Sequence, residues 1–265
     1  MMHMESGEMK DFRSITERYT FVHTPPNHLD YVQFRYPPKV PFTGAPPWKC
    51  SQYYYWWEFL KRNKTYKETC HNGGGGSCEQ LYIDFGDIYA SPFLEWWNSH
   101  LQLFAEPALS SEDFAAALGI DVDNLAVFPN PEKSLTALFD QMRFMHQHLR
   151  HHYPGRSPLA DRMPQYPIYK RAKVSCLHLT LLVYDLKELN PDASDLDIAE
   201  LAGIRSSLRL DGRSLNQLPR FDFDWLNLKR DVEKYQKSAV QRLTRMANQY
   251  VENVGLGIFP KSDVR

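Results

Sequence analysis

The side chains best suited to a recognisable chemistry lie between residues 205 and 213, where arginine and serine alternate with leucine. Guanidinium groups and hydroxyls donate hydrogen bonds to base edges in DNA grooves and to phosphate oxygens. The residues of this kind are Arg205, Ser206, Ser207, Arg209 and Arg213. Their composition favours a contact with double-stranded DNA, provided that a neighbouring element presents them together.

The residues just before this cluster predict such an element, a helix-turn-helix. Ser194 is a good N-cap for the helix that follows it. Ala199 is small enough for a close helix crossing, and Gly203 tolerates the positive φ of a tight turn. A second helix beginning near Arg205 would enter the major groove by its N-terminal end.

The second helix is short, because Asp211-Gly212 breaks it after about six residues. An ordinary helix that ends at a glycine C-cap is therefore an equally good interpretation of residues 194–204. In the helix-turn-helix interpretation Ile198 and Ile204 are buried, and residues 177–190 form the supporting helix.

Residues 228–254 predict the longest helix, because their apolar side chains recur every three or four positions. Six cations off this apolar stripe are candidates for phosphate contacts: Lys229, Arg230, Lys234, Lys237, Arg242 and Arg245. Asp231 and Glu233 stand among them, so a solvated helix face is the alternative.

A zinc site is the metal chemistry to weigh. The potential ligands are Cys50, Cys70, His71 and Cys78, but four glycines (73–76) interrupt them and their spacing matches no compact zinc knuckle. The glycine run is either natural or an inserted linker. We expect no metal and no other cofactor.

No enzyme motif stands out. Asp84, Asp87, Glu95 and Glu106 have no nucleophile at a recognisable spacing, and no Lys-Ser/Thr follows the glycine run as in a phosphate-binding loop. We expect a non-enzymatic protein.

Charge is segregated along this chain of 265 residues, although the formal net charge is only −1. Residues 141–173 carry +6, residues 174–204 carry −5 and residues 205–265 carry +5. Uneven charge of this kind suits nucleic acid or an acidic partner. The first residues lack the apolar run of a secretion signal, and no stretch is apolar enough for a membrane span, which predicts a cytoplasmic protein without a membrane partner.

The fold class expected is mainly α with minor β, in two helical domains. Residues 1–152 would form an aromatic-rich domain with a proline-rich arm, residues 153–169 a proline-rich linker, and residues 170–265 a domain resembling a helix-turn-helix. The helices expected are 53–66, 91–104, 111–118, 131–150, 177–190 and 228–254, with short strands at 81–89, which could instead be a loop, and at 125–128.

The paired tryptophans 56–57 and 96–97 are most simply core residues. The alternative is an aromatic surface that binds a protein partner, because one ring of each pair must point away from the other. A protein partner on this aromatic N-terminal half, or a homodimer, is thus expected beside DNA.

Three segments carry a faint resemblance to known sequences: YYYWWEFLKRN, LYIDFGDIYASPFLEWW and LHLTLLVYDLKELNPDASDLDIAELAGI. They resemble uncharacterised tryptophan-rich proteins of bacterial mobile elements and phages that carry a predicted helix-turn-helix. The resemblance implies a DNA-binding or regulatory protein of a mobile element. The alternative is a protein-interaction factor in phage–host conflict, or a subunit of a larger nucleoprotein complex.

Overall fold

The computed structural model of the chain describes residues 19–27, 38–107 and 164–262. The chain divides into two compact units, one of residues 1–22 with 101–165 and one of residues 23–100 with 166–265. The described part of the first unit contains β1 (Tyr19–Thr20), paired antiparallel with β2 (Glu106–Pro107), and the 3-10 turn η3 (Leu101–Leu103). The predicted elements 111–118, 125–128 and 131–150 lie outside the described residues.

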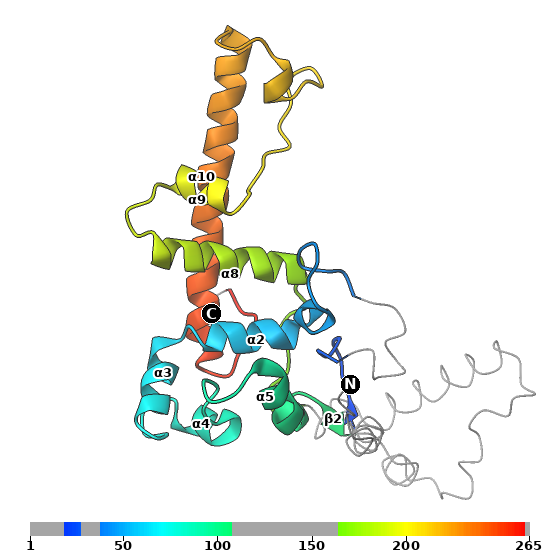
Figure 1. Cartoon of the computed structure of the whole chain (residues 1–265), viewed down its shortest axis with the longest axis vertical. Coiled ribbons are helices and arrows are strands. Elements are labelled where there is room, and N and C mark those ends of the chain that lie inside the picture. The colour runs from blue at the N-terminus through cyan, green and yellow to red at the C-terminus, as the bar shows by residue number, and fades with distance from the viewer. Residues whose placement is uncertain (1–18, 28–37, 108–163, 263–265) are drawn as a thin grey trace, which may run out of the picture. The chain divides into compact units, whose positions relative to one another are not determined.

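The described part of the second unit is built from helices, so the predicted mainly α fold is confirmed (Figure 1). Its α-helices are α2 (Gln52–Leu60), α3 (Lys64–His71), α4 (Glu79–Phe85), α5 (Phe93–His100), α8 (Val174–Leu189), α9 (Asp195–Leu201) and α10 (Phe223–Val254). Two short 3-10 helices, η2 (Pro47–Cys50) and η6 (Leu215–Gln217), complete it. Helix α10 packs against α8, α9 and α2.

The core of this unit is aromatic. All four tryptophans of the two pairs are buried, which confirms that they are core residues. Trp56 stacks on Phe85 with ring centroids 6.4 Å apart, and the Trp96 indole donates a hydrogen bond of 2.8 Å to the Phe85 carbonyl. These rings therefore offer no exposed surface to a partner, and α4 and α5 are held on α2 by aromatic contacts.

Contacts between distant segments make the second unit discontinuous in sequence. The Arg62 guanidinium donates two hydrogen bonds of 2.6 Å to the Asp185 carboxylate of α8. The Asn63 amide donates one of 2.6 Å to the Val251 carbonyl of α10. Residues expected in an N-terminal and a C-terminal domain thus pack together, and the grouping differs from the boundaries expected at 153–169.

The single helix predicted for residues 53–66 is wrong, because the chain turns between α2 and α3. The Asn63 side chain accepts a hydrogen bond of 2.8 Å from the Tyr66 backbone N–H and so caps α3. Asparagine competes with the helical backbone in this way, which is why it favours caps over helix interiors. Two short helices at an angle replace one long helix.

The strand or loop predicted for residues 81–89 is wrong for residues 81–85, because residues 79–85 form α4, whereas residues 86–89 do form a loop. Leu81 and Phe85, four residues apart, point into the core, and Gly86 ends the helix with a φ of +64°. The spacing of Leu81 and Phe85 is thus that of one helix face, although apolar and polar residues alternate in this segment. The helix predicted for 91–104 is shorter than expected, since α5 ends at His100 and η3 follows it.

The glycine run forms a packed turn between α3 and α4. Gly74 has a φ of +106°, and a Cβ there would lie 2.6 Å from the Tyr82 ring. Gly76 has a φ of +143°, and a Cβ there would lie 2.9 Å from Thr69 Oγ1. A free linker would meet no such restriction, so the packing favours glycines that belong to the fold.

Replacing Gly74 with alanine is expected to destabilise the protein by about 1–3 kcal/mol, through strained backbone and a clash with Tyr82. Gly75→Ala is the matched control, because its Cβ would meet only the Asn72 carbonyl at 3.9 Å and its φ is not in the left-handed region. It should change the free energy of unfolding by no more than about 0.5 kcal/mol. Urea denaturation measures both; equal effects would contradict a packed turn.

Candidate nucleic-acid interface

Helix α9 begins where the sequence predicts. The Ser194 hydroxyl accepts a hydrogen bond of 3.3 Å from the Asp197 N–H, and the Asp197 carboxylate accepts one of 3.0 Å from the Ser194 N–H. This reciprocal pair is a capping box. Gly203 follows the helix with a φ of +66°, the conformation for which a glycine was predicted there.

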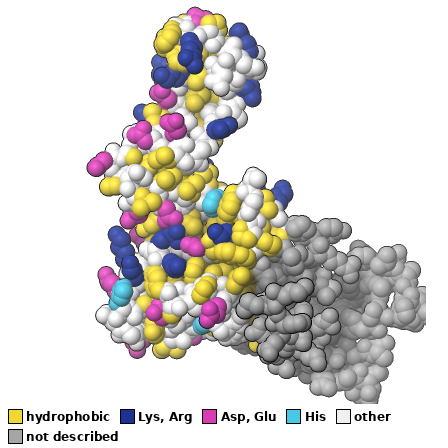
Figure 2. All heavy atoms as spheres, in the orientation of Figure 1, with side chains coloured by type: hydrophobic (Ala, Val, Ile, Leu, Met, Phe, Trp, Pro, Cys, Tyr) yellow, Lys and Arg dark blue, Asp and Glu magenta, His cyan; other side chains and the backbone are white. Residues whose placement is uncertain are grey.

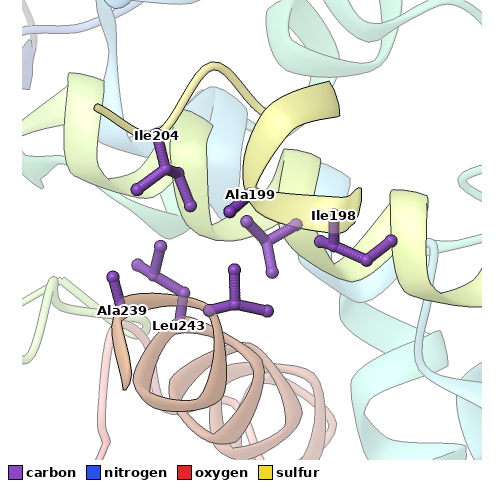
Figure 3. Close-up of a cluster of buried hydrophobic side chains, with 7 residues drawn as sticks. Ile198, Ala199, Ile204, Ala239 and Leu243 are labelled. Atoms are coloured by element: carbon purple, nitrogen blue, oxygen red, sulfur yellow. The ribbon is translucent and has the colours of Figure 1, made fainter. Parts of the chain in front are cut away.

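A cluster of buried side chains packs α9 and its turn onto α8 and α10. Figure 3 shows Ala199 and Ile204 directed toward Ala239 and Leu243 of α10. Ala199 is 0% exposed, and the predicted burial of Ile198 and Ile204 is confirmed. The predicted supporting helix also forms, as α8. The first half of the helix-turn-helix prediction therefore describes this scaffold correctly.

The second helix of that motif does not form. Residues 204–209 have no regular secondary structure, and residues 210–213 make a tight turn. Leu210 and Arg213 exchange backbone hydrogen bonds of 2.9 and 2.8 Å, while Asp211 and Gly212 both have positive φ. Asp-Gly strongly favours this kind of turn. The Gln236 side chain of α10 also donates to the Ile204 carbonyl, so the segment runs along α10 instead of coiling.

The candidates on this segment are not gathered on one helical face. Arg205, Ser207, Arg209 and Arg213 are exposed, and Ser206 is half-buried with its hydroxyl accepting from the Leu208 N–H at 3.1 Å. Arg205 borders a depression of about 340 Å³ between α9 and α10. Arg209 borders a second hollow of about 540 Å³ against α10. A recognition helix presenting all five is therefore absent.

The six candidate cations on α10 are all exposed. The Lys229 ammonium lies 3.7 Å from the Glu233 carboxylate and 5.2 Å from the Trp225 ring centroid. Arg230 donates to the Asn227 side-chain oxygen at 3.2 Å. Lys234 and Arg242 point in directions about 80° apart around the helix axis, because eight residues correspond to about 80° beyond two full turns.

A row of exposed polar and basic side chains runs along the solvent side of α10. Steps of three and four residues place six exposed polar side chains on the face opposite its buried residues: Arg230, Lys234, Lys237, Gln241, Arg245 and Asn248. No acidic residue occupies this face between them. We call this set the α10 cationic stripe. Figure 2 shows Lys and Arg side chains over the projecting part of α10.

Of the six cations predicted to lie off the apolar face of this helix, four belong to the α10 cationic stripe: Arg230, Lys234, Lys237 and Arg245. Their spacing separates them from Asp231 and Glu233 once the helix phase is known. Lys229 and Arg242 lie outside the stripe.

Asp195 at the start of α9 fixes that helix to both neighbours. Its carboxylate accepts a hydrogen bond of 2.6 Å from the Lys187 ammonium of α8 and one of 2.9 Å from the Gln241 amide of α10. The bond from Lys187 is the largest cause that holds the pKa of this carboxyl below its ordinary value, and Lys237 contributes at longer range.

The four possible zinc ligands do not assemble among the described residues, where no three His, Cys, Asp or Glu side chains come together as a metal would need. The Cys50 thiol faces the Pro46 carbonyl at 3.8 Å and the Cys78 thiol the Gly255 carbonyl at 3.7 Å. Burial raises the pKa of Cys70 to about 11 and also raises the pKa of Cys50 and of Cys78. Raised values favour the protonated thiol, which is not the ligand form.

No described helix is both long and apolar enough to cross a membrane. No protein-family model matches the chain, and neither a curated protein nor a solved structure is significantly similar to it. The resemblance to proteins of mobile elements therefore stays a prediction, and the proposals below rest on the geometry of the chain itself.

Ala199→Leu is expected to destabilise the protein by about 1–3 kcal/mol, because the added side chain has no room where α9 crosses α10. Leu201→Ala on the same helix is the control, since Leu201 is 59% exposed and should change stability by no more than about 0.5 kcal/mol. Thermal or urea unfolding separates the two, and an unchanged Ala199→Leu variant would refute the close crossing.

The anchor at Asp195 predicts a pH dependence. Because its folded pKa is depressed, the ionised carboxylate stabilises the protein above the ordinary pKa of about 3.9, and this contribution is lost as the pH falls through the folded value. Asp195→Asn should therefore lower the free energy of unfolding at neutral pH, with a difference from wild type that shrinks below about pH 4. The exposed Asp192→Asn should not reproduce this profile in urea titrations.

Proposed function

We propose that the protein is a non-enzymatic factor that binds double-stranded DNA through the phosphate backbone, using the α10 cationic stripe. The observation that carries the proposal is an exposed face of α10 with four cations and two amides and no acidic residue of α10 between them; one of the amides, Gln241, donates to the Asp195 carboxylate of α9. Lysine, arginine and side-chain amides are the groups that contact phosphate oxygens.

The length of the stripe supports this mode of binding. Arg230 and Arg245 are fifteen residues apart, about 22 Å along the helix. Duplex DNA carries one negative charge per about 1.7 Å of its axis, so a rod of cations of this length faces several phosphates at once. Each neutralised phosphate releases counterions, which supplies affinity at low salt.

Little sequence preference is expected from this geometry. Backbone contacts position a protein on DNA, whereas base contacts specify the site. Arg205, Arg209 and Arg213 lie on an extended segment and a turn, not on a helix that fits the major groove. A regulatory role on a mobile element, which the resemblance implies, would then need a partner to select the site.

A protein-interaction factor is the second candidate function. It is favoured by large apolar side chains at the free end of α10, where Phe221 is 78% and Phe223 is 75% exposed. Exposed aromatic residues beside cations are typical of interface hot spots. This surface is a candidate binding place for such a partner in addition to the aromatic N-terminal half.

The DNA proposal predicts a specific salt response. A variant with Lys234, Lys237 and Arg245 all changed to Gln should bind DNA duplexes more weakly than wild type. The loss of affinity should be the same for duplexes of different sequence. The slope of log affinity against log salt should fall in magnitude by about 2.7, since each lost phosphate contact removes about 0.9. Fluorescence anisotropy across a salt series measures both quantities.

A matched control changes three exposed lysines elsewhere in the same unit, Lys39, Lys64 and Lys67, to Gln. This control removes the same charge and should leave the slope much nearer the wild-type value. Equal losses in both triple variants would mean that net charge alone acts. Folded wild-type protein that binds no duplex at low salt would refute the proposal, and a loss confined to one DNA sequence in Arg209→Ala would instead indicate base reading.

A further inference from the structure

The α10 cationic stripe ends in two exposed apolar side chains. Phe223, the first residue of α10, is 75% exposed, and Leu226 is 50% exposed. Phe223 precedes Arg230 by seven residues, about 20° short of two full turns, and Leu226 precedes it by four residues, about 40° beyond one turn. Both side chains therefore continue the face of the helix that carries the cations. We call this pair the apolar end of the stripe.

The acidic residues near the apolar end lie off that face. Asp224 and Asp231 point about 120° and 100° away from Arg230 around the helix axis. The Asp222 carboxylate accepts a hydrogen bond of 2.8 Å from the Phe223 N–H. These three acids are exposed and balance the exposed cations around them, so the apolar end adds no positive charge to the stripe. What it adds is an uncharged aromatic ring.

An exposed ring at the end of a row of cations suits the unpaired bases of a nucleic acid. Proteins that bind single strands combine cations that follow the phosphate backbone with aromatic side chains on which the bases stack. A base is uncharged, so the acids beside the ring do not repel it as they would repel a phosphate. In a duplex the base faces are already covered by their neighbours, so the ring can stack only where a strand is unpaired.

The spacing along α10 fits a strand that passes from a duplex into an unpaired tail. Phe223 lies seven residues, or about 10 Å along the axis, beyond Arg230, the outermost cation of the stripe. Each strand of a duplex has a phosphate per about 3.4 Å of axis, so the ring stands about three nucleotides past that cation. In Figure 1 this end of α10 projects beyond α8 and α9. A strand that leaves the stripe therefore meets the ring next.

A second exposed ring at this end of the helix belongs to a different side. Phe221 is 78% exposed, and its ring centroid lies 5.6 Å from that of Trp225. Trp225 precedes Arg230 by five residues and points about 140° away from it. Phe221 and Phe223 are thus equally exposed rings, of which only Phe223 is on the face of the stripe.

We propose that the protein binds DNA at the junction between a duplex and an unpaired strand, with the stripe on duplex phosphates and the Phe223 ring stacked on an unpaired base. This assignment rests on the proposed function, because the stripe must hold the duplex. It gives the protein a preference for a DNA structure although its backbone contacts read no base sequence.

Fluorescence anisotropy of the full chain on three DNA probes at low salt tests the junction. The first is a blunt duplex, and in the second one strand extends at both ends as an unpaired tail of about six nucleotides. The third has tails of the same length without bases, which keep the phosphates and remove the stacking. Wild type should bind the second probe at least about fivefold more tightly than the first and the third.

Phe223→Ala should abolish most of that preference and leave binding to the blunt duplex and the thermal midpoint unchanged, because the ring is exposed. Phe223→Trp should keep the preference, since any large aromatic ring stacks on a base. Phe221→Ala is the matched control, because it removes an equally exposed ring from the other side of the helix, and it should keep the preference as well.

Wild type that binds the three probes equally would overturn the junction, leave the duplex proposal standing and favour a protein partner for these rings. Equal losses in Phe223→Ala and Phe221→Ala would also overturn it, because exposed apolar area and not the face of the stripe would then act. So would a Phe223→Ala variant that loses affinity equally for blunt and tailed DNA. Folded wild-type protein that binds none of the probes would refute the proposed function itself.

Discussion

The buried amide of Asn63 joins the two distant halves of the second unit. Its oxygen caps α3, and its nitrogen donates to the Val251 carbonyl near the end of α10. Gly255 lies so close that a Cβ there would come within 2.5 Å of the Asn63 nitrogen. A buried amide with both ends bonded is costly to leave unsatisfied, by about 1–3 kcal/mol. The base of α10, and with it everything that α10 carries, depends on this junction.

The projecting half of α10 is stable for a different reason. Its buried side chains are sparse before Ala239, and the segment of residues 204–222 runs back along it and supplies contacts through η6 and the Ile204 carbonyl. The extended segment that replaced the predicted second helix therefore supports a long helix that has no other neighbour there among the described residues. The first half of the α10 cationic stripe, from Arg230 to Lys237, lies on this supported arm.

Local sequence predicted those elements whose signals are local. The capping residue Ser194, the positive φ at Gly203 and the apolar period of α10 each act within a few residues, and each was found. The second helix failed because the Asp211-Gly212 turn and the contact with Gln236 outweighed a weak helical preference. The sequence correctly predicted that the cations of α10 are exposed. Which of them lie together depends on the helix phase and on which neighbour covers each face of the helix. The discontinuous second unit could not be predicted from the sequence, since no local pattern marks a contact between Asn63 and Val251.

That contact joins residues 188 positions apart in the chain. At ribosomal rates of about 5–20 residues per second, roughly 10–40 s separate the synthesis of Asn63 from that of Val251. During this interval the aromatic face of α2 has been made while α10, which covers part of it, has not. The nascent chain therefore displays Trp- and Tyr-rich surface for tens of seconds, a length of time over which chaperones, and not the finished fold, would have to protect it from aggregation.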